Sequence, residues 1–181
     1  MEYRIEKDSI GEIKVPVDKL WGAQTQRSFE NFRIGTEKIP IELVEVFGVL
    51  KRAAAAVNKE LGLLDEVRAD AIIAACDELL ENKLEGNFPL SVWQTGSGTQ
   101  FNMNINEVLA HRAEQILAAK GQEIKVHPND HVNRSQSSND IFPTSLHVAG
   151  LTLIRKQLLP ALGALLHTLQ GKSEEFNSII K

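Results

Sequence analysis

The chain has 181 residues, of which 43% are hydrophobic and 24% are charged, and its net charge is -4 at neutral pH. This composition supports a buried core and leaves no basic face, so a nucleic-acid partner is not expected. The single cysteine, Cys76, lies in an apolar helical run, which excludes a disulfide framework and indicates a buried thiol. The start of the chain has no apolar signal segment, and no uninterrupted apolar run approaches the ~18 residues of a membrane span. We therefore expect a cytoplasmic protein with no membrane partner.

Residues 1–40 predict an irregular arm. Polar and apolar residues alternate over 12–15, which is typical of one short strand. Glycine and proline indicate turns around it, at Gly11, Pro16, Gly22 and Gly35. A short β arm ahead of the first helix follows from this pattern.

Four longer segments carry apolar residues at helical spacing. The first covers 41–61 and begins after Pro40, which suits a first helical turn. The second covers 67–84, and the third covers 102–120. The fourth begins near Asp140 and carries a long line of leucines. The predicted fold class is mainly α, an amino-terminal helical domain with a short β arm followed by the start of a long central helical bundle.

The fourth helix contains two prolines. Pro143 is expected in its first turn, where proline is tolerated, and Pro160 is expected to kink the helix without ending it. Residues 173–181 predict a further helix, because no glycine, asparagine or proline stop signal follows. The start of the long helix is the one plausible boundary, so we predict two domains, 1–139 and 140–181.

A polar segment from Gln94 to Asn102 leads into the third helix. Its glycines allow the backbone to approach a ligand closely, and Ser97 and Thr99 add hydroxyl donors beside the unpaired N–H groups of the first turn. This pattern suits an anion, although an ordinary capped turn explains the same residues. The spacing matches neither a Walker loop nor a dinucleotide fingerprint.

A second hydroxyl-rich segment covers 135–140, directly before the fourth helix. Ser138 or Asn139 can cap that helix, and Asp140 complements its dipole. The same groups can donate to a carboxylate or to a developing enediolate. The segment alone leaves both interpretations open.

A third segment holds two histidines four residues apart, His127 and His131, with Asn129 and Asp130 between them. Pro128 argues against a helix at His127, which removes the geometry that would make such a pair a metal site. A turn built on asparagine and aspartate is the favoured interpretation. No metal or organic cofactor is predicted, and no hydrolase, zinc or redox motif is present in the sequence.

Three stretches of the chain together resemble the fumarase and aspartase superfamily. One reads Gly-Ser-Gly-Thr-Gln-x-Asn-Met-Asn-x-Asn-Glu-Val over 96–108, and another begins with His-Pro-Asn-Asp and runs through Ser-Gln-Ser-Ser-Asn-Asp over 127–140. The third is Leu-Trp-Gly-Ala-Gln-Thr-Gln-Arg-Ser over 20–28. Relatives that deaminate aspartate carry Ser-Thr-Asn in place of Ser137-Ser138-Asn139, so the chain is similar to the amino-terminal part of class II fumarases. Three long matches in one order are far more specific than any short motif.

The resemblance implies which residues bind ligands. Seven residues are expected to line a site for a dicarboxylate, fumarate or malate: Ser97, Gly98, Thr99, Asn102, Ser137, Ser138 and Asn139. Four are expected to form a second anion site: His127, Pro128, Asn129 and Asp130. Two positions depart from the family pattern, since Phe101 replaces a small polar residue and Ile124 replaces an arginine of the second site.

The resemblance also implies reversible hydration of fumarate to malate, a tricarboxylic acid cycle reaction, by a homotetramer without cofactor. The family's proton-transfer residues, a histidine and a loop serine, are expected after Lys181, so no catalytic residue is predicted within this chain. One alternative is an aspartate ammonia-lyase or a related lyase. Another is a truncated, non-catalytic protein that binds dicarboxylates or associates with itself.

Overall fold

The computed structural model describes residues 2–180, and they are mainly helical, which confirms the predicted fold class. They divide into two compact units, 2–145 and 146–180. The predicted domain boundary between 139 and 140 stays a prediction. The elements in chain order are β1 (Tyr3–Asp8), β2 (Gly11–Pro16), α1 (Ala23–Asn31), α2 (Ile41–Glu60), α3 (Glu66–Leu80), α4 (Thr99–Ala119), the π-helical turn η1 (Pro128–Val132), α5 (Ser138–Leu153), the π-helical turn η2 (Ile154–Leu158) and α6 (Leu159–Glu175).

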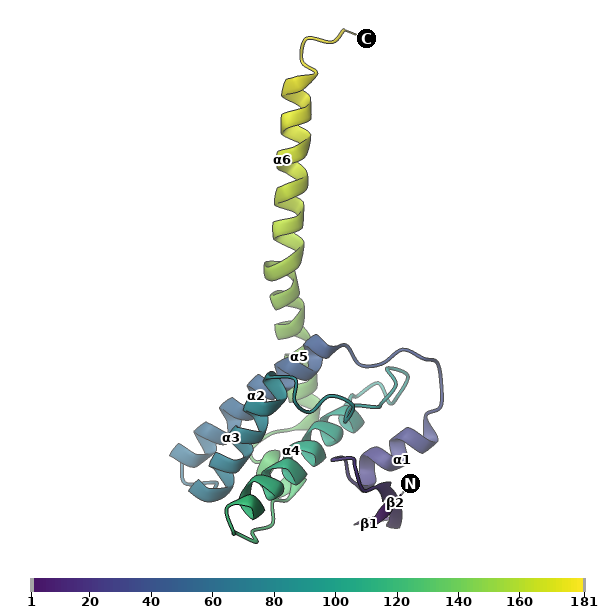
Figure 1. Cartoon of the computed structure of the whole chain (residues 1–181), viewed down its shortest axis with the longest axis vertical. Coiled ribbons are helices and arrows are strands. Elements are labelled where there is room, and N and C mark those ends of the chain that lie inside the picture. Colours follow the sequence, from purple (N-terminus) through teal and green to yellow (C-terminus); the bar gives the residue numbers. More distant parts are fainter. Residues whose placement is uncertain (1, 181) are drawn as a thin grey trace. The chain divides into compact units, whose positions relative to one another are not determined.

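The amino-terminal arm is more regular than the sequence predicts. β2 confirms the expected strand, and β1 pairs with it in an antiparallel hairpin (Figure 1). The prediction missed β1 because its more buried face carries Arg4, Glu6 and Asp8, whereas Tyr3 and Ile5 are exposed. Buried charges in place of apolar residues hide the usual strand pattern.

Helix α1 also lies in the arm that was predicted to be irregular. Its buried positions include Thr25, Gln26 and Ser28, so the sequence shows no apolar stripe. The helix is held by polar contacts: Arg27 donates from Nε and Nη2 to Asp8, at 2.8 and 3.0 Å. The prediction of an irregular arm with one short strand was therefore wrong for Ala23–Asn31, because the polar buried face of this helix gives no apolar pattern.

The core of the first unit forms where α3 packs against both α2 and α4 (Figure 1). Phe47, Ile72 and Ile105, one from each helix, are completely buried. Cys76 of α3 is buried as predicted, and burial raises the pKa of its thiol to about 12. The thiol therefore stays neutral at physiological pH, as a small apolar core group does.

The ends of the second and third predicted helices differ from the observed ones. The helix predicted over 67–84 stops at Leu80, since Asn82 adopts a left-handed backbone conformation with φ of 59°. Asparagine tolerates this conformation and often ends a helix. The helix predicted from about 102 begins at Thr99, after Gly98 in the left-handed conformation.

The helix predicted from Asp140 begins at Ser138 instead. Pro143 therefore lies beyond the first turn, which corrects the prediction. Because proline has no N–H, the carbonyl of Asn139 lacks its ordinary donor within the helix.

In the second unit, the chain continues as helix through η2 and α6 as far as Glu175. Pro160 does not end the helix, as predicted, and the five residues before Leu159 take a π-helical turn. Such turns accommodate a proline that cannot supply its hydrogen bond. The new helix predicted over 173–181 is wrong, because α6 ends at Glu175 and Phe176 caps it.

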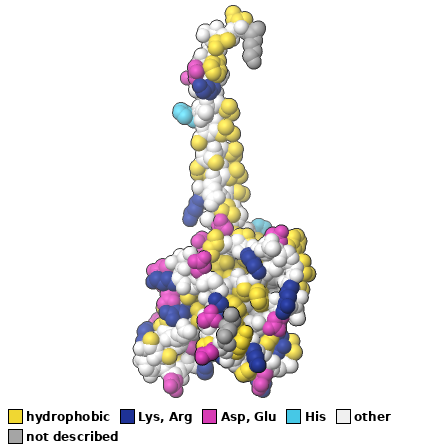
Figure 2. Space-filling model, turned by 45° about the vertical axis from the view of Figure 1, so that its right-hand side comes forward, with side chains coloured by type: hydrophobic (Ala, Val, Ile, Leu, Met, Phe, Trp, Pro, Cys, Tyr) yellow, Lys and Arg dark blue, Asp and Glu magenta, His cyan; other side chains and the backbone are white. Residues whose placement is uncertain are grey.

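Apolar side chains remain exposed along one side of the helix in the second unit (Figure 2). The leucines of this stripe are about half exposed: Leu151, Leu158, Leu159, Leu162, Leu165, Leu166 and Leu169. The helix Ser138–Glu175 is long and apolar enough to cross a membrane by length and composition alone, since one 18-residue window in it has a mean hydropathy of 1.2. An amphipathic helix that packs against other protein helices meets the same criteria.

Candidate functional site

The amino terminus of α4 presents free donors beside two exposed or half-buried hydroxyls. Gly98 precedes the helix with φ of 66°, and its carbonyl accepts from the N–H of Asn102 at 3.1 Å. The hydroxyls of Ser97 and Thr99 lie 3.1 Å apart and can turn to a ligand. The first N–H groups of an α-helix have no partner within it, so this end attracts an anion.

Gly98 also lies against α5, the helix that follows the second polar segment. A Cβ at this position would lie 2.2 Å from Cγ of Phe142, in the second turn of α5. The ring of Phe47 packs edge-on against Phe101 at 5.1 Å and lies 6.3 Å from Phe142. Phe101, one of the two departures from the family pattern, is thus a core residue here. The aromatic contacts hold the starts of α4 and α5 together.

The start of α5 carries the second group of donors. The carbonyl of Ser137 accepts from the N–H groups of Asp140 and Ile141, at 3.1 and 2.9 Å, so the helix begins there. Ser137 and Asn139 are exposed, and Ser138 is half-buried. Among the described residues, no hydrogen bond or ion pair joins these side chains to Ser97 or Thr99, although Phe142 of α5 lies against Gly98 at the start of α4.

A buried amide cluster connects the two segments. Nζ of Lys51, on α2, donates to Oδ1 of Asn102 and to Oδ1 of Asn133, both at 2.8 Å. Nδ2 of Asn133 in turn donates to the carbonyl of Gln136 at 3.0 Å. The lysine therefore links the first turn of α4 to the loop that precedes Ser137.

Lys51 is completely buried, and its hydrogen-bond acceptors among the described residues are amide oxygens. Burial lowers the pKa of its ammonium group to about 7. Sequence reasoning missed this residue. The available signal was its spacing, four residues from Phe47 and four from Ala55, which places a charge in the buried face of α2.

The third segment forms the helical turn η1, which corrects the expectation of an Asn-Asp turn. Nδ1 of His127 accepts from the N–H groups of Asn129 and Asp130, at 3.3 and 3.2 Å. Nδ1 of His131 accepts from the N–H of His127 at 2.7 Å. Burial, with a smaller effect of Arg68, lowers the pKa of His131, which agrees with a neutral ring that accepts a hydrogen bond. Both histidines thus cap backbone groups of this turn.

A cavity of about 850 Å³ lies between the hairpin, α4 and η1. His127, Pro128 and Asn129 of the predicted second anion site line it, and Asp130 does not. None of the seven residues predicted to bind the dicarboxylate lines this cavity. Within residues 2–180, no group of three or more histidine, cysteine, aspartate or glutamate side chains is placed to hold a metal ion.

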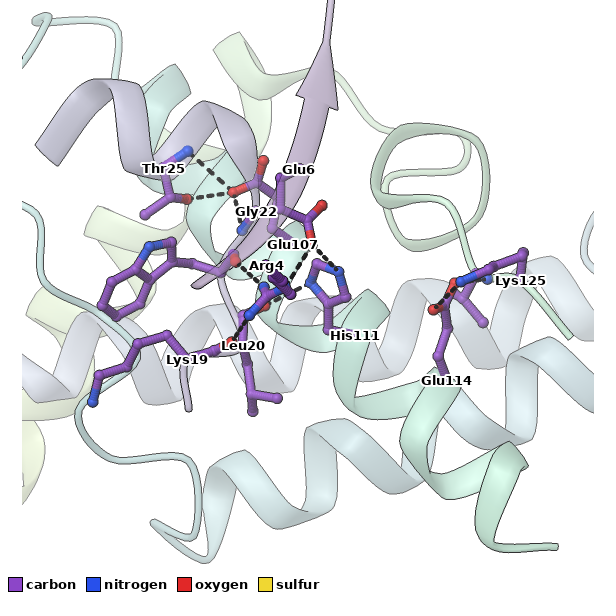
Figure 3. Close-up of polar contacts among 12 residues, drawn as sticks. Arg4, Glu6, Lys19, Leu20, Gly22, Thr25, Glu107, His111, Glu114 and Lys125 are labelled. Atoms are coloured by element: carbon purple, nitrogen blue, oxygen red, sulfur yellow. Dashed lines mark hydrogen bonds and ion pairs between the residues drawn. The ribbon is translucent and has the colours of Figure 1, made fainter. Parts of the chain in front are cut away.

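Glu107 fixes the third matching stretch to α4. Its Oε2 accepts from N–H of Gly22 at 2.9 Å and from Oγ1 of Thr25 at 2.6 Å (Figure 3). Its Oε1 accepts from N–H of Gln24 at 2.9 Å. A carboxylate at the start of α1 satisfies its free donors and complements its dipole. This residue, too, was not singled out from the sequence. The stretch over 20–28 therefore has a structural role in the described part of the chain.

Further along α4, His111 lies between the hairpin and the loop that follows it (Figure 3). Its Nδ1 lies 2.7 Å from the carbonyl of Leu20, and its Nε2 lies 3.3 Å from the carboxylate of Glu6. Burial lowers the pKa of His111, but the hydrogen bond and charge of Glu6 outweigh burial and raise it. Burial raises the pKa of Glu6, and His111 and Arg4 together lower it to about 2. The pair therefore favours a protonated histidine.

With this geometry, the chain can be compared with known proteins. A model of the lyase family matches residues 11–181. The chain belongs to the lyase family. The chain is 58% identical over 181 residues to the class II fumarate hydratase of Bacillus subtilis, a match that covers 100% of the chain and 39% of that protein. The predicted resemblance to class II fumarases is thereby confirmed.

Solved structures show the same fold. The crystal structure of class II fumarase from Schistosoma mansoni matches with a TM-score of 0.92 and 41% identity, over 96% of the present chain and 37% of the fumarase chain. The structure of fumarate lyase:delta crystallin from Brucella melitensis in native form matches with a TM-score of 0.91 and 40% identity, over 99% of the present chain and 42% of the Brucella melitensis chain. The present chain spans about 39% of the length of the curated relatives that it matches.

Proposed function

We propose that this lyase chain supplies the dicarboxylate-binding segments of a fumarate hydratase, which interconverts fumarate and malate. The observation that carries the proposal is the packing of two donor-rich helix starts around the contact of Gly98 with Phe142. The similarity to proteins named fumarate hydratase supports the choice of substrate. Water, and not ammonia, is the group added.

The binding groups have complementary chemistry. Ser97, Thr99 and the first N–H groups of α4 offer donors to one carboxylate, and Ser138 and Asn139 at the start of α5 offer donors to the other. Gly98 keeps the backbone accessible, and Asn102 and Ser137 complete the set.

Removing a proton next to the malate carboxylate builds negative charge as an enediolate. Fixed donors lower the energy of that charge, because they need no reorganisation. The proton-transfer groups are not assigned to residues of this chain.

A second anion site is proposed at His127, Pro128, Asn129 and Asp130. Three of these residues line the cavity between the hairpin and η1, which supports an anion reaching them. Lys125 and His131 line the same cavity and add donors. Position 124 is isoleucine, so this site should bind an anion more weakly than a site that has arginine at the same position.

The complete enzyme is proposed to be a cytoplasmic homotetramer. The exposed leucine stripe on η2 and α6 supports association, because a continuous apolar face of this length is rarely left in water (Figure 2). Other copies of the same helix are the expected partners, and nucleic acid and membrane are not. Sedimentation velocity of the complete enzyme measures this assembly directly, and a monomer at micromolar concentration contradicts it.

A hybrid enzyme tests the proposed activity. Residues 1–181 would replace the matching 39% of the Bacillus subtilis fumarate hydratase, which supplies the remaining chain. Fumarate is offered to the hybrid with water alone and, separately, with ammonium. Malate formation supports the proposal, and aspartate formation in its place assigns the chain to an ammonia-lyase. A folded hybrid that forms neither product contradicts a catalytic role for these segments.

A further inference from the structure

We propose that Lys51 is a positioning residue for the dicarboxylate site, which holds the two binding segments in register and places a positive charge behind them. The inference rests on the proposed function. It concerns a residue on α2, outside all three matching stretches.

The hydrogen bonds of Lys51 reach both segments. On one side, its contact with Oδ1 of Asn102 fixes an amide in the first turn of α4. On the other side, its contact with Oδ1 of Asn133 orients that amide so that Nδ2 holds the carbonyl of Gln136. Oδ1 of Asn133 also lies 3.3 Å from Nδ2 of Asn102 and from Nδ2 of Asn106. Oδ1 of Asn133 thus accepts from three donors, and the orientation of this amide depends on Lys51.

The charge of Lys51 points to the same role. A completely buried ammonium without a carboxylate partner is costly, and proteins rarely keep one without a function. The titratable neighbour on α3 is Cys76, whose thiol stays neutral because burial raises its pKa to about 12. The helix α4 and the loop after η1 contribute the amides of Asn102 and Asn133. A bound dicarboxylate would supply the negative charge that these surroundings lack.

Steady-state kinetics of the hybrid enzyme test the proposal. Lys51→Met removes the charge and both hydrogen bonds while keeping the length of the side chain. It is expected to raise KM for fumarate, and Ki for the unreactive dicarboxylate succinate, by about tenfold or more, with a smaller change in kcat. Lys51→Arg, which keeps the charge and the donors, is expected to recover part of this loss. Arg52→Met is the matched control, because it removes a charge of the same sign from an exposed neighbour.

Asn133→Ala provides a second variant that leaves Lys51 in place. It removes the hydrogen bond to the carbonyl of Gln136 and is expected to raise KM for fumarate and Ki for succinate, as Lys51→Met does. The proposal is overturned if both variants have the KM for fumarate and the Ki for succinate of the parent hybrid, and differ from it only in a lower yield of folded enzyme. A parent hybrid that is active, with unaffected variants, rejects the role of Lys51 alone. A folded but inactive parent rejects the proposed function, and the role of Lys51 with it.

Discussion

The carboxylate of Glu107 lies 2.6 Å from the hydroxyl of Thr25, although the two residues are 82 positions apart in the sequence. The same carboxylate accepts from the N–H groups of Gly22, Gln24 and Thr25. Because Glu107 is buried, these bonds replace water around its charge. The start of α1 is therefore tied to the middle of α4 by one side chain.

Replacing Glu107 should weaken the whole first unit. Glu107→Gln keeps the shape but turns an NH₂ group toward backbone donors, so at least one buried group loses its partner. We expect a loss of roughly 2–4 kcal/mol in the free energy of unfolding. Urea unfolding followed by circular dichroism measures it, with Glu45→Gln on the exposed face of α2 as the control. Equal stability of the two variants would show that the carboxylate contributes no more than a surface charge.

Gly98→Ala should damage both stability and substrate binding. The new Cβ would lie 2.2 Å from the Phe142 ring, in a left-handed conformation with φ of 66°. We expect a loss of about 2–4 kcal/mol and a raised KM in the hybrid enzyme. Gly96→Ala is the matched control, since no heavy atom lies within 4 Å of a Cβ there. A well-folded Gly98→Ala variant with normal KM would contradict the packing of the two helix starts.

Lys51→Met should remove a rise in stability between pH 7 and pH 9. Burial lowers the pKa of Lys51 from 10.5 to about 7, so over this range the unfolded chain binds more protons than the folded chain. Raising the pH therefore stabilises the parent chain relative to the variant, by up to about 1.4 kcal/mol per pH unit. Urea unfolding at both pH limits gives the difference. The range ends at pH 9 because the Cys76 thiol then titrates in the unfolded chain. A difference that does not change with pH would contradict a buried, titrating lysine.

His111 should stabilise the folded chain more at low pH than at high pH, which is opposite to the effect of Lys51. Its pKa is raised in the folded chain, since the carboxylate of Glu6 outweighs burial. The stabilisation is therefore complete below the ordinary pKa of 6.5 and is lost as the pH rises through the folded value. His111→Gln should lower the free energy of unfolding most near pH 5.5 and less near pH 8.5. The two losses should differ by roughly 0.5–1 kcal/mol, as expected for a partly exposed pair. Thermal melting of both chains at the two pH values measures this. A larger cost at the higher pH would contradict the ion pair.

Apolar spacing predicted the helices of the core, since their buried faces carry residues such as Phe47 and Ile72. It failed where polar groups are buried. β1 turns Arg4 and Glu6 inward, and the buried face of α1 is mostly polar, so neither element shows an apolar pattern. Apolar spacing indicates a buried face only where apolar side chains form it, so it gives no sign of half-buried charges whose partners lie far along the chain.

The candidate site was predicted in part. The segments containing Ser97 and Ser138 were recognised from their motifs, and the structure places both at helix starts. Lys51 was not recognised, because its partners, Asn102 and Asn133, come from two other parts of the chain. Only the packing of α2 against them reveals that a lysine connects the two segments.

A crystal structure of the hybrid enzyme with succinate tests the central claim most directly. The account predicts one carboxylate within hydrogen-bond distance of Ser97 or Thr99, and the other within reach of Ser138 or Asn139. Succinate bound without contact to either helix start would contradict the assignment of these segments to the dicarboxylate.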